Sequence, residues 1–109
     1  MKVKVSEATP IQLDWMVEMV ECDGAMYSGR APRPFSTDWA QGGSIIEREG
    51  IGLNKRNEHY LNEGFWQASY WKRIEMYAGL TPLIAAMRCY VASRLGDEVE
   101  IPEEKAHED

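Results

Sequence analysis

The sequence predicts an α+β fold, in which a small antiparallel sheet packs against two helices in a single domain. Two helix-start signals, Thr9-Pro10 and Thr81-Pro82, each precede apolar residues at helical spacing. Between the two helices, residues 44–71 contain alternating and aromatic side chains, as paired strands do. Helices and strands that do not strictly alternate favour this class over a parallel sheet covered by helices. A chain of 109 residues is long enough to bury one core.

The first elements are predicted to be a strand and a helix. Residues 2–5 alternate polar and apolar side chains, which is typical of a half-buried strand. A helix is predicted over Pro10–Cys22, because apolar residues recur there at helical spacing after the Thr9-Pro10 signal. The Asp23-Gly24 pair is expected to end it. Residues 24–34 contain two glycines and two prolines beyond that point, and they are expected to form a loop.

The middle of the chain is predicted to form a β-hairpin. Ser44–Leu53 is typical of a strand, and Asn54–Asn57 of the exposed turn that follows it. The return strand is expected within residues 58–71, where aromatic side chains are concentrated. The pattern leaves residues 72–78 unassigned.

A single helical turn is expected just before this hairpin. The Ser36-Thr37-Asp38 triplet can cap a turn that runs through Gln41, and Gly42-Gly43 is expected to end it. Under this interpretation Glu47 and Glu49 share one face of the following strand. Paired carboxylates could serve acid–base chemistry, but a solvated strand face is the commoner explanation.

The second long helix is predicted over Pro82–Leu95, with Gly96 as its stop. Nearly every side chain in it is apolar, so it is either the core helix or a helix shared with a second subunit. A short edge strand is expected at Val99–Ile101. The domain is therefore assigned to residues 1–102, and residues 103–109 to an acidic flexible tail.

The net charge of −6 comes from the C-terminal end of the chain. Residues 97–109 hold seven acidic residues against one lysine, which leaves residues 1–96 neutral. This distribution argues against general nucleic-acid binding, which depends on neutralising phosphates. No apolar run approaches the roughly 20 residues that cross a bilayer, so no membrane partner is expected.

The chain offers little for metal or cofactor chemistry. Two histidines, His59 and His107, stand apart from any ligand at metal-binding spacing, so no metal and no cofactor are predicted. Cys22 and Cys89 lie within apolar helical patterns and are expected to be reduced, buried thiols in a cytosol. No serine or cysteine has the surroundings of a nucleophile, so no catalytic residue is assigned.

The stretch from Phe35 to Glu49, which reads FSTDWAQGGSIIERE, resembles the NinX-like family of small bacteriophage proteins. The segments Thr81–Ser93, Leu95–Pro102 and Met1–Trp15 share this resemblance, whereas Gly52–Gly79 carries little of it. The resemblance implies a phage origin, an accessory role and the cytoplasm of the infected bacterial host. It assigns no catalytic residue.

Arg88 is the only charged residue between Pro82 and Ser93. An always-ionised guanidinium seldom stays buried without a partner. One interpretation is a structural ion pair with Asp38 or Glu47. The other is an anchor for a ligand phosphate or carboxylate, with Arg48 as a second cation or a surface residue.

Trp39 also has two interpretations. It is either a plug under the neighbouring loop, which is the commoner role, or a stacking platform for a base. With Asp38 as an acceptor for a base edge or ribose and Gly42-Gly43 beside it, the second interpretation completes a ligand site. The predicted ligand-binding residues are therefore Asp38, Trp39, Gly42, Gly43, Arg48 and Arg88.

Two functions of different classes follow. In the first, the chain is a non-catalytic binding protein for a small anionic ligand, plausibly a nucleotide signal sequestered in a counter-defence role. In the second, it is an interaction module that modulates a host or phage protein through an aromatic surface. An enzyme ranks third. The apolar second helix and the excess of aromatic residues also predict a homodimer.

Overall fold

The structure of the protein is a computed structural model that describes residues 1–23, 31–56, 65–70 and 75–103. The elements follow the order β1 (Lys2–Lys4), a 3-10 helix η1 (Val5–Glu7), α1 (Pro10–Glu21), α2 (Trp39–Glu49), β2 (Ile51–Arg56), β3 (Phe65–Tyr70), β4 (Tyr77–Gly79), α3 (Pro82–Leu95) and β5 (Glu98–Glu100). Helices packed with two antiparallel sheets confirm the predicted α+β class.

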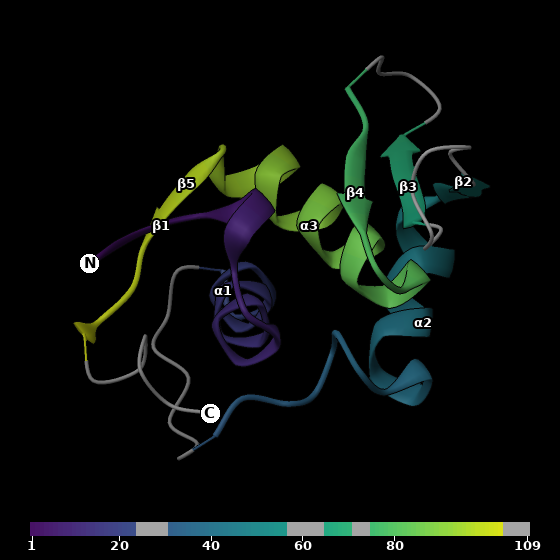
Figure 1. The fold of residues 1–109 in the computed structure, drawn as a ribbon. Coiled ribbons are helices and arrows are strands. Elements are labelled where there is room, and N and C mark those ends of the chain that lie inside the picture. Colours follow the sequence, from purple (N-terminus) through teal and green to yellow (C-terminus); the bar gives the residue numbers. More distant parts are fainter. Residues whose placement is uncertain (24–30, 57–64, 71–74, 104–109) are drawn as a thin grey trace.

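Helix α3 runs through the middle of the protein. Figure 1 shows it with the sheet of β2, β3 and β4 at one end, and with α1 and the strands β1 and β5 at the other. Its side chains are therefore buried in several directions, among them Met87, Cys89, Tyr90 and Val91. This arrangement explains within one chain why α3 is apolar all round. The self-association predicted partly from this helix stays a prediction.

Two separate antiparallel sheets make up the β structure. In the larger sheet β3 is central, and its Ala68 pairs with Leu53 of β2 and with Tyr77 of β4. In the smaller sheet the first and last strands of the chain pair, so that Val3 lies opposite Val99. The predicted pairing is confirmed in part, because β3 lies within residues 58–71 but β2 overlaps the predicted first strand only at Ile51–Leu53.

Both long helices begin where the local signals predict. Thr9 caps α1 in a reciprocal capping box with Gln12, and Pro10 is the first helical residue. Thr81 caps α3 by accepting a hydrogen bond from the backbone of Ile84. These caps accept hydrogen bonds from backbone N–H groups that have no partner inside the helix. They therefore favour the same helix start regardless of how the rest of the chain folds.

The region around the Gly-Gly pair differs from the prediction. Neither a single turn ending at Gly42-Gly43 nor a strand beginning at Ser44 is present, because α2 continues through both glycines as far as Glu49. Gly50, with a φ of 69°, ends the helix, and β2 starts at Ile51. A Gly-Gly pair predicts a break on propensity alone, but tertiary packing holds the helix together here.

Smaller differences concern the other strands. The predicted turn at Asn54–Asn57 is wrong for its first three residues, which belong to β2, and Asn57 lies outside the described residues. Val5 belongs to η1 rather than to the first strand, and β5 begins one residue earlier than expected, at Glu98. The unassigned stretch 72–78 contains the start of β4 at Tyr77, although residues 72–74 lie outside the described part.

The structure describes both predicted thiols, but only the first residue of the predicted acidic tail. Cys22 and Cys89 are both free, as expected, but only Cys89 is fully buried. Cys22 is half-buried because it caps the end of α1 instead of lying on its inner face. The division between a domain and an acidic tail stays a prediction, since residues 104–109 lie outside the described part.

An ion pair between a buried glutamate and a partly exposed arginine holds the segment before α2 against α1. The Glu18 side chain, only 1% exposed, accepts hydrogen bonds from the Arg33 guanidinium at 2.6 and 3.0 Å and from the Arg33 backbone N–H. Four residues earlier on α1, Asp14 accepts from the backbone of Ser36. These two carboxylates fix the path of residues 33–36 and therefore the place where α2 begins.

Candidate functional site

Trp39 is the first residue of α2, and its indole is 56% exposed. The prediction that it plugs the neighbouring loop is wrong. A Cβ atom at Gly43 would lie 3.4 Å from the ring atom Cε3 of Trp39, so the indole lies along the helix over this glycine. One edge of the ring contacts the helix while much of its surface faces solvent.

Asp38 serves first as the N-cap of α2. Its carboxylate accepts a hydrogen bond of 2.9 Å from the backbone N–H of Ala40, and its own carbonyl accepts from Gln41 and Gly42. The negative charge also suits the positive end of the helix dipole. The same charge repels an anion at this helix end, which weakens the case for a phosphate beside Trp39.

The two adjacent glycines of α2 have different surroundings. A Cβ atom at Gly42 would lie 2.2 Å from the carbonyl oxygen of Phe35 and 2.7 Å from Cδ2 of Leu83. Gly42 is therefore required for the close approach of α2 to the preceding segment and to α3. Gly43 faces outward beneath Trp39. Neither glycine forms the loop that cradles a phosphate.

Arg48, near the C-terminal end of α2, belongs to a network of charged and hydroxyl groups. Its guanidinium contacts Glu21 of α1 at 3.0 Å and Glu49 at 3.1 Å, and it donates to the hydroxyl of Tyr90 at 2.9 Å. Tyr90 in turn donates to Glu21, and Arg94 of α3 contacts Glu49 at 2.6 Å. The network joins the C-terminal parts of all three described helices.

Each ionisable group in this network has a shifted pKa. Burial alone would raise the pKa of Glu21, but hydrogen bonds from Arg48 and Tyr90 outweigh it and hold the pKa below its usual value. Burial likewise opposes the bonds from Arg48 and Arg94 that lower the pKa of Glu49. Burial and the bond to Glu21 raise the pKa of Tyr90. The carboxylates are therefore charged and the phenol is neutral near pH 7.

Arg88 occupies a third position, between β4 and the segment after η1. Its Nη1 donates to the carbonyl of Ala78 at 2.9 Å and its Nη2 to the carbonyl of Ala8 at 3.1 Å. The predicted ion pair with Asp38 or Glu47 is wrong, and within the described residues Arg88 has no carboxylate partner. Burial lowers its pKa, and its Nε lacks a hydrogen-bond acceptor in this part of the chain.

The six predicted ligand-binding residues therefore lie in three places. Asp38, Trp39 and the two glycines share the N-terminal half of α2, Arg48 lies at its other end, and Arg88 bonds to β4. The predicted pairing of Glu47 with Glu49 on a strand face is also wrong, because both are helical. Of the side chains predicted to contact the ligand, only the indole of Trp39 and the carboxylate of Asp38 lie next to each other.

Sequence reasoning missed most of the network around Arg48. Tyr90 and Arg94 lie one turn apart on α3, and the guanidinium of Arg94 lies 5.3 Å from the Tyr90 ring centre. This spacing of a tyrosine and an arginine, in a helix whose other residues are mostly apolar, was the signal available in the sequence. Glu21 offered no comparable signal, since its partners come from two other helices.

A protein-family model described as "Bacteriophage P22, NinX" matches residues 27–94, more than half of the chain. The matched region contains α2, the three-stranded sheet and nearly all of α3, including the middle stretch where the sequence resemblance was slight. No curated protein matches the chain. Among the described residues, no helix is long and apolar enough to cross a membrane, and no group of three metal-ligating side chains occurs.

Proposed function

This chain belongs to the NinX family of bacteriophage proteins, which makes it a phage accessory protein, and we propose that it acts by binding another protein rather than by catalysis. The exposed indole of Trp39 supports this proposal most directly. The cytoplasm of the infected bacterium is the compartment in which such a partner would be met.

Trp39 has the properties of a binding hot spot. Tryptophan is enriched among the few residues that contribute most of the free energy of a protein interface. Contact with the helix at Gly43 restrains the ring, so little side-chain freedom remains to be lost on binding. A large apolar group that is both exposed and restrained adds nothing evident to the core, whereas it suits a partner's pocket.

The surroundings of Trp39 also favour a protein partner. Ala40, Ser44 and Glu47 are exposed on the same side of α2 as Trp39 and Gly43, at helical spacing. We call these five residues the Trp39 face. Three of the five are small, so a partner's backbone can approach the helix closely while the indole fills a pocket.

A second candidate function is binding of a small anionic ligand such as a nucleotide signal, in a counter-defence role. The observation in its favour is that Arg48 and Arg94 contact the same carboxylate, that of Glu49, while their side chains remain 51% and 49% exposed. Two such guanidinium groups close together can grip a phosphate. Because both are already paired, we rank this function below protein binding.

Site-specific photo-crosslinking in phage-infected cells tests the proposal. A photoreactive residue at position Ser44 should capture a partner protein, whereas the same residue at Met19, on the exposed side of α1, should not. The identified partner is then purified, and its affinity is compared for the wild type, Trp39→Ala and the control Met19→Ala. We expect Trp39→Ala to weaken binding by about thirtyfold or more, as loss of a hot-spot residue does.

Two outcomes would contradict this proposal. The first is equal crosslinking from Ser44 and Met19, or equal affinity of Trp39→Ala and the wild type. The second is a small molecule that co-purifies with the protein in native mass spectrometry, survives Trp39→Ala and is lost on Arg94→Met. That result would establish the anionic-ligand function instead.

A further inference from the structure

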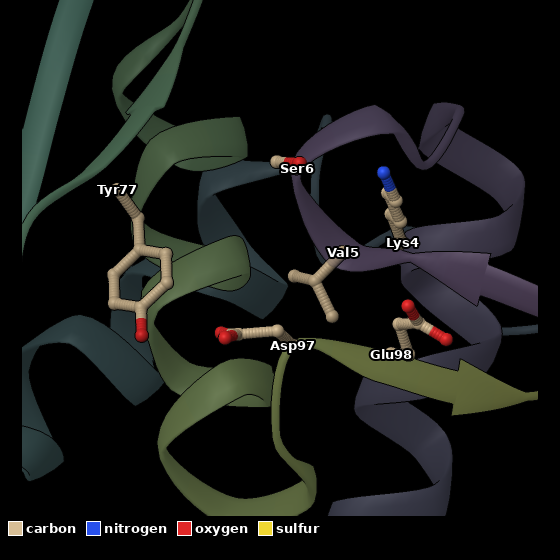
Figure 2. A pocket seen from close by; sticks show the side chains of 6 residues that line it. All are labelled: Lys4, Val5, Ser6, Tyr77, Asp97 and Glu98. Carbon is tan, nitrogen blue, oxygen red and sulfur yellow. The ribbon is translucent and has the colours of Figure 1, made fainter.

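A small pocket lies where the two sheets of the protein meet without joining. Figure 2 shows it between β4 on one side and β1, η1 and β5 on the other. Its volume is about 230 Å³, and it is lined by Lys4, Val5, Ser6, Tyr77, Asp97 and Glu98. Because a water molecule takes up about 30 Å³ of the liquid, the pocket has room for a small ligand of up to about eight heavy atoms.

Several contacts hold the walls of this pocket in place. The buried Val5 donates its backbone N–H to the carbonyl of Asp97 at 2.9 Å, which ties η1 to the start of β5. Arg88 spans the same junction by donating to the carbonyls of Ala8 and Ala78. The gap between the sheets is therefore a fixed feature of the fold.

The charges around the pocket do not balance. Lys4 and Glu98 are direct partners in the register of β1 and β5, but both are exposed and no ion pair joins them. The lining therefore holds one ammonium group against two carboxylates. The carboxylate of Asp97 points toward Tyr77 in Figure 2, and within the described residues it makes no hydrogen bond or ion pair.

Asp97 is an exposed residue at the C-terminal end of α3. It follows Gly96, the residue that ends α3, and so lies beside the negative end of the helix dipole. The negative end of a helix attracts cations, so α3 adds to the attraction of this carboxylate for a positively charged ligand.

We propose that this pocket binds a small organic cation through a primary ammonium group. The ammonium donates to the carboxylate of Asp97 at the end of α3, and its short alkyl chain lies against Val5 and the ring of Tyr77. An organic cation fits better than Mg²⁺ or Ca²⁺. The two carboxylates of the lining are fewer than the oxygen ligands that a protein cage for Ca²⁺ supplies.

The test is an NMR titration of the full-length protein with propylammonium chloride, with backbone amide shifts as the readout. Sodium chloride at equal ionic strength is the blank, and sodium acetate is the anionic probe. We expect saturable shifts at Val5, Tyr77 and Asp97 with propylammonium alone. Asp97→Asn should weaken binding by about tenfold or more, the value of a hydrogen bond to a charged group.

Two further variants make the test selective. Glu103→Gln removes one negative charge beyond the end of β5 that is away from the pocket, and should leave the affinity for propylammonium unchanged. Lys4→Gln removes the cation of the lining. It should strengthen binding, because the Lys4 ammonium group competes with the ligand for the carboxylates of the pocket. Since the Asp97 side chain is exposed and has no partner within the described residues, Asp97→Asn should keep the native fold and the wild-type amide spectrum elsewhere.

Three results would overturn the proposal. One is a response to propylammonium no larger than the response to sodium chloride. Another is equal binding by Asp97→Asn and the wild type, which would mean a diffuse attraction to an acidic protein. The third is saturable binding of acetate that Lys4→Gln abolishes, which would make this an anion site. None of these results bears on the Trp39 face, so the two proposals can fail separately.

Discussion

The adjacent glycines of α2 allow a matched test of how this helix packs. Alanine in place of either glycine removes the same backbone freedom and should stabilise the helix by about 1 kcal/mol. The two sites differ in what the new methyl group meets. At Gly42 it would lie 2.2 Å from the carbonyl oxygen of Phe35, whereas at Gly43 its nearest neighbour is a ring atom of Trp39 at 3.4 Å.

The expected effects therefore have opposite signs. A contact of 2.2 Å with a backbone atom forces α2 to move, and overpacking of this kind costs about 3 kcal/mol. Subtracting the gain in helix propensity leaves Gly42→Ala destabilised by about 2 kcal/mol. Gly43→Ala should be stabilised by about 0.5–1 kcal/mol, since only the edge of an exposed indole has to adjust.

Urea unfolding followed by circular dichroism measures both free energies directly. Thermal melts should separate the two variants by about 10 °C, because a change of 1 kcal/mol moves the midpoint by roughly 4 °C at this chain length. Equal stabilisation of both variants would refute the packing of α2 on the Phe35 carbonyl. A larger loss of stability in Gly43→Ala than in Gly42→Ala would instead favour a hinge at the glycine pair.

Other expected outcomes concern the charged groups. Arg33→Met should lower the free energy of unfolding in urea by about 3 kcal/mol, because it strands the buried carboxylate of Glu18; a loss below about 1 kcal/mol would contradict this. Arg88→Met should lower the free energy of unfolding by less, about 1–2 kcal/mol in the same assay. It removes hydrogen bonds to two carbonyls, but it also removes the desolvation penalty of a half-buried guanidinium. Glu21 and Glu49 have lowered pKa values, so the stability they contribute is present above about pH 4.5 and is lost as the pH falls through those values. The stability difference between wild type and Glu21→Gln, measured by urea unfolding from pH 7 to pH 3, should accordingly shrink with acid, and a constant difference would show that Glu21 is not held as described.

The helix starts and the fold class could be predicted because they depend on neighbours in the chain. Thr9 and Thr81 cap the backbone within three residues of themselves, and the apolar spacing after each is visible in the sequence. The antiparallel pairing of β2 with β3 follows from two adjacent stretches with strand composition. Such short-range preferences need no knowledge of the distant parts of the chain.

The candidate site depended on contacts between residues far apart in the sequence. On propensity alone, Gly42 predicts the end of a helix. In the structure it lies inside α2, because the carbonyl of Phe35 occupies the space that a side chain would need. Arg88 was expected beside carboxylates of the signature stretch, yet the packing of α3 against β4 gives it backbone carbonyls instead. Trp39 could be buried or exposed on sequence alone. Its place at the solvent side of the first turn of α2 was decided by where α1 holds the preceding segment, which is a tertiary contact.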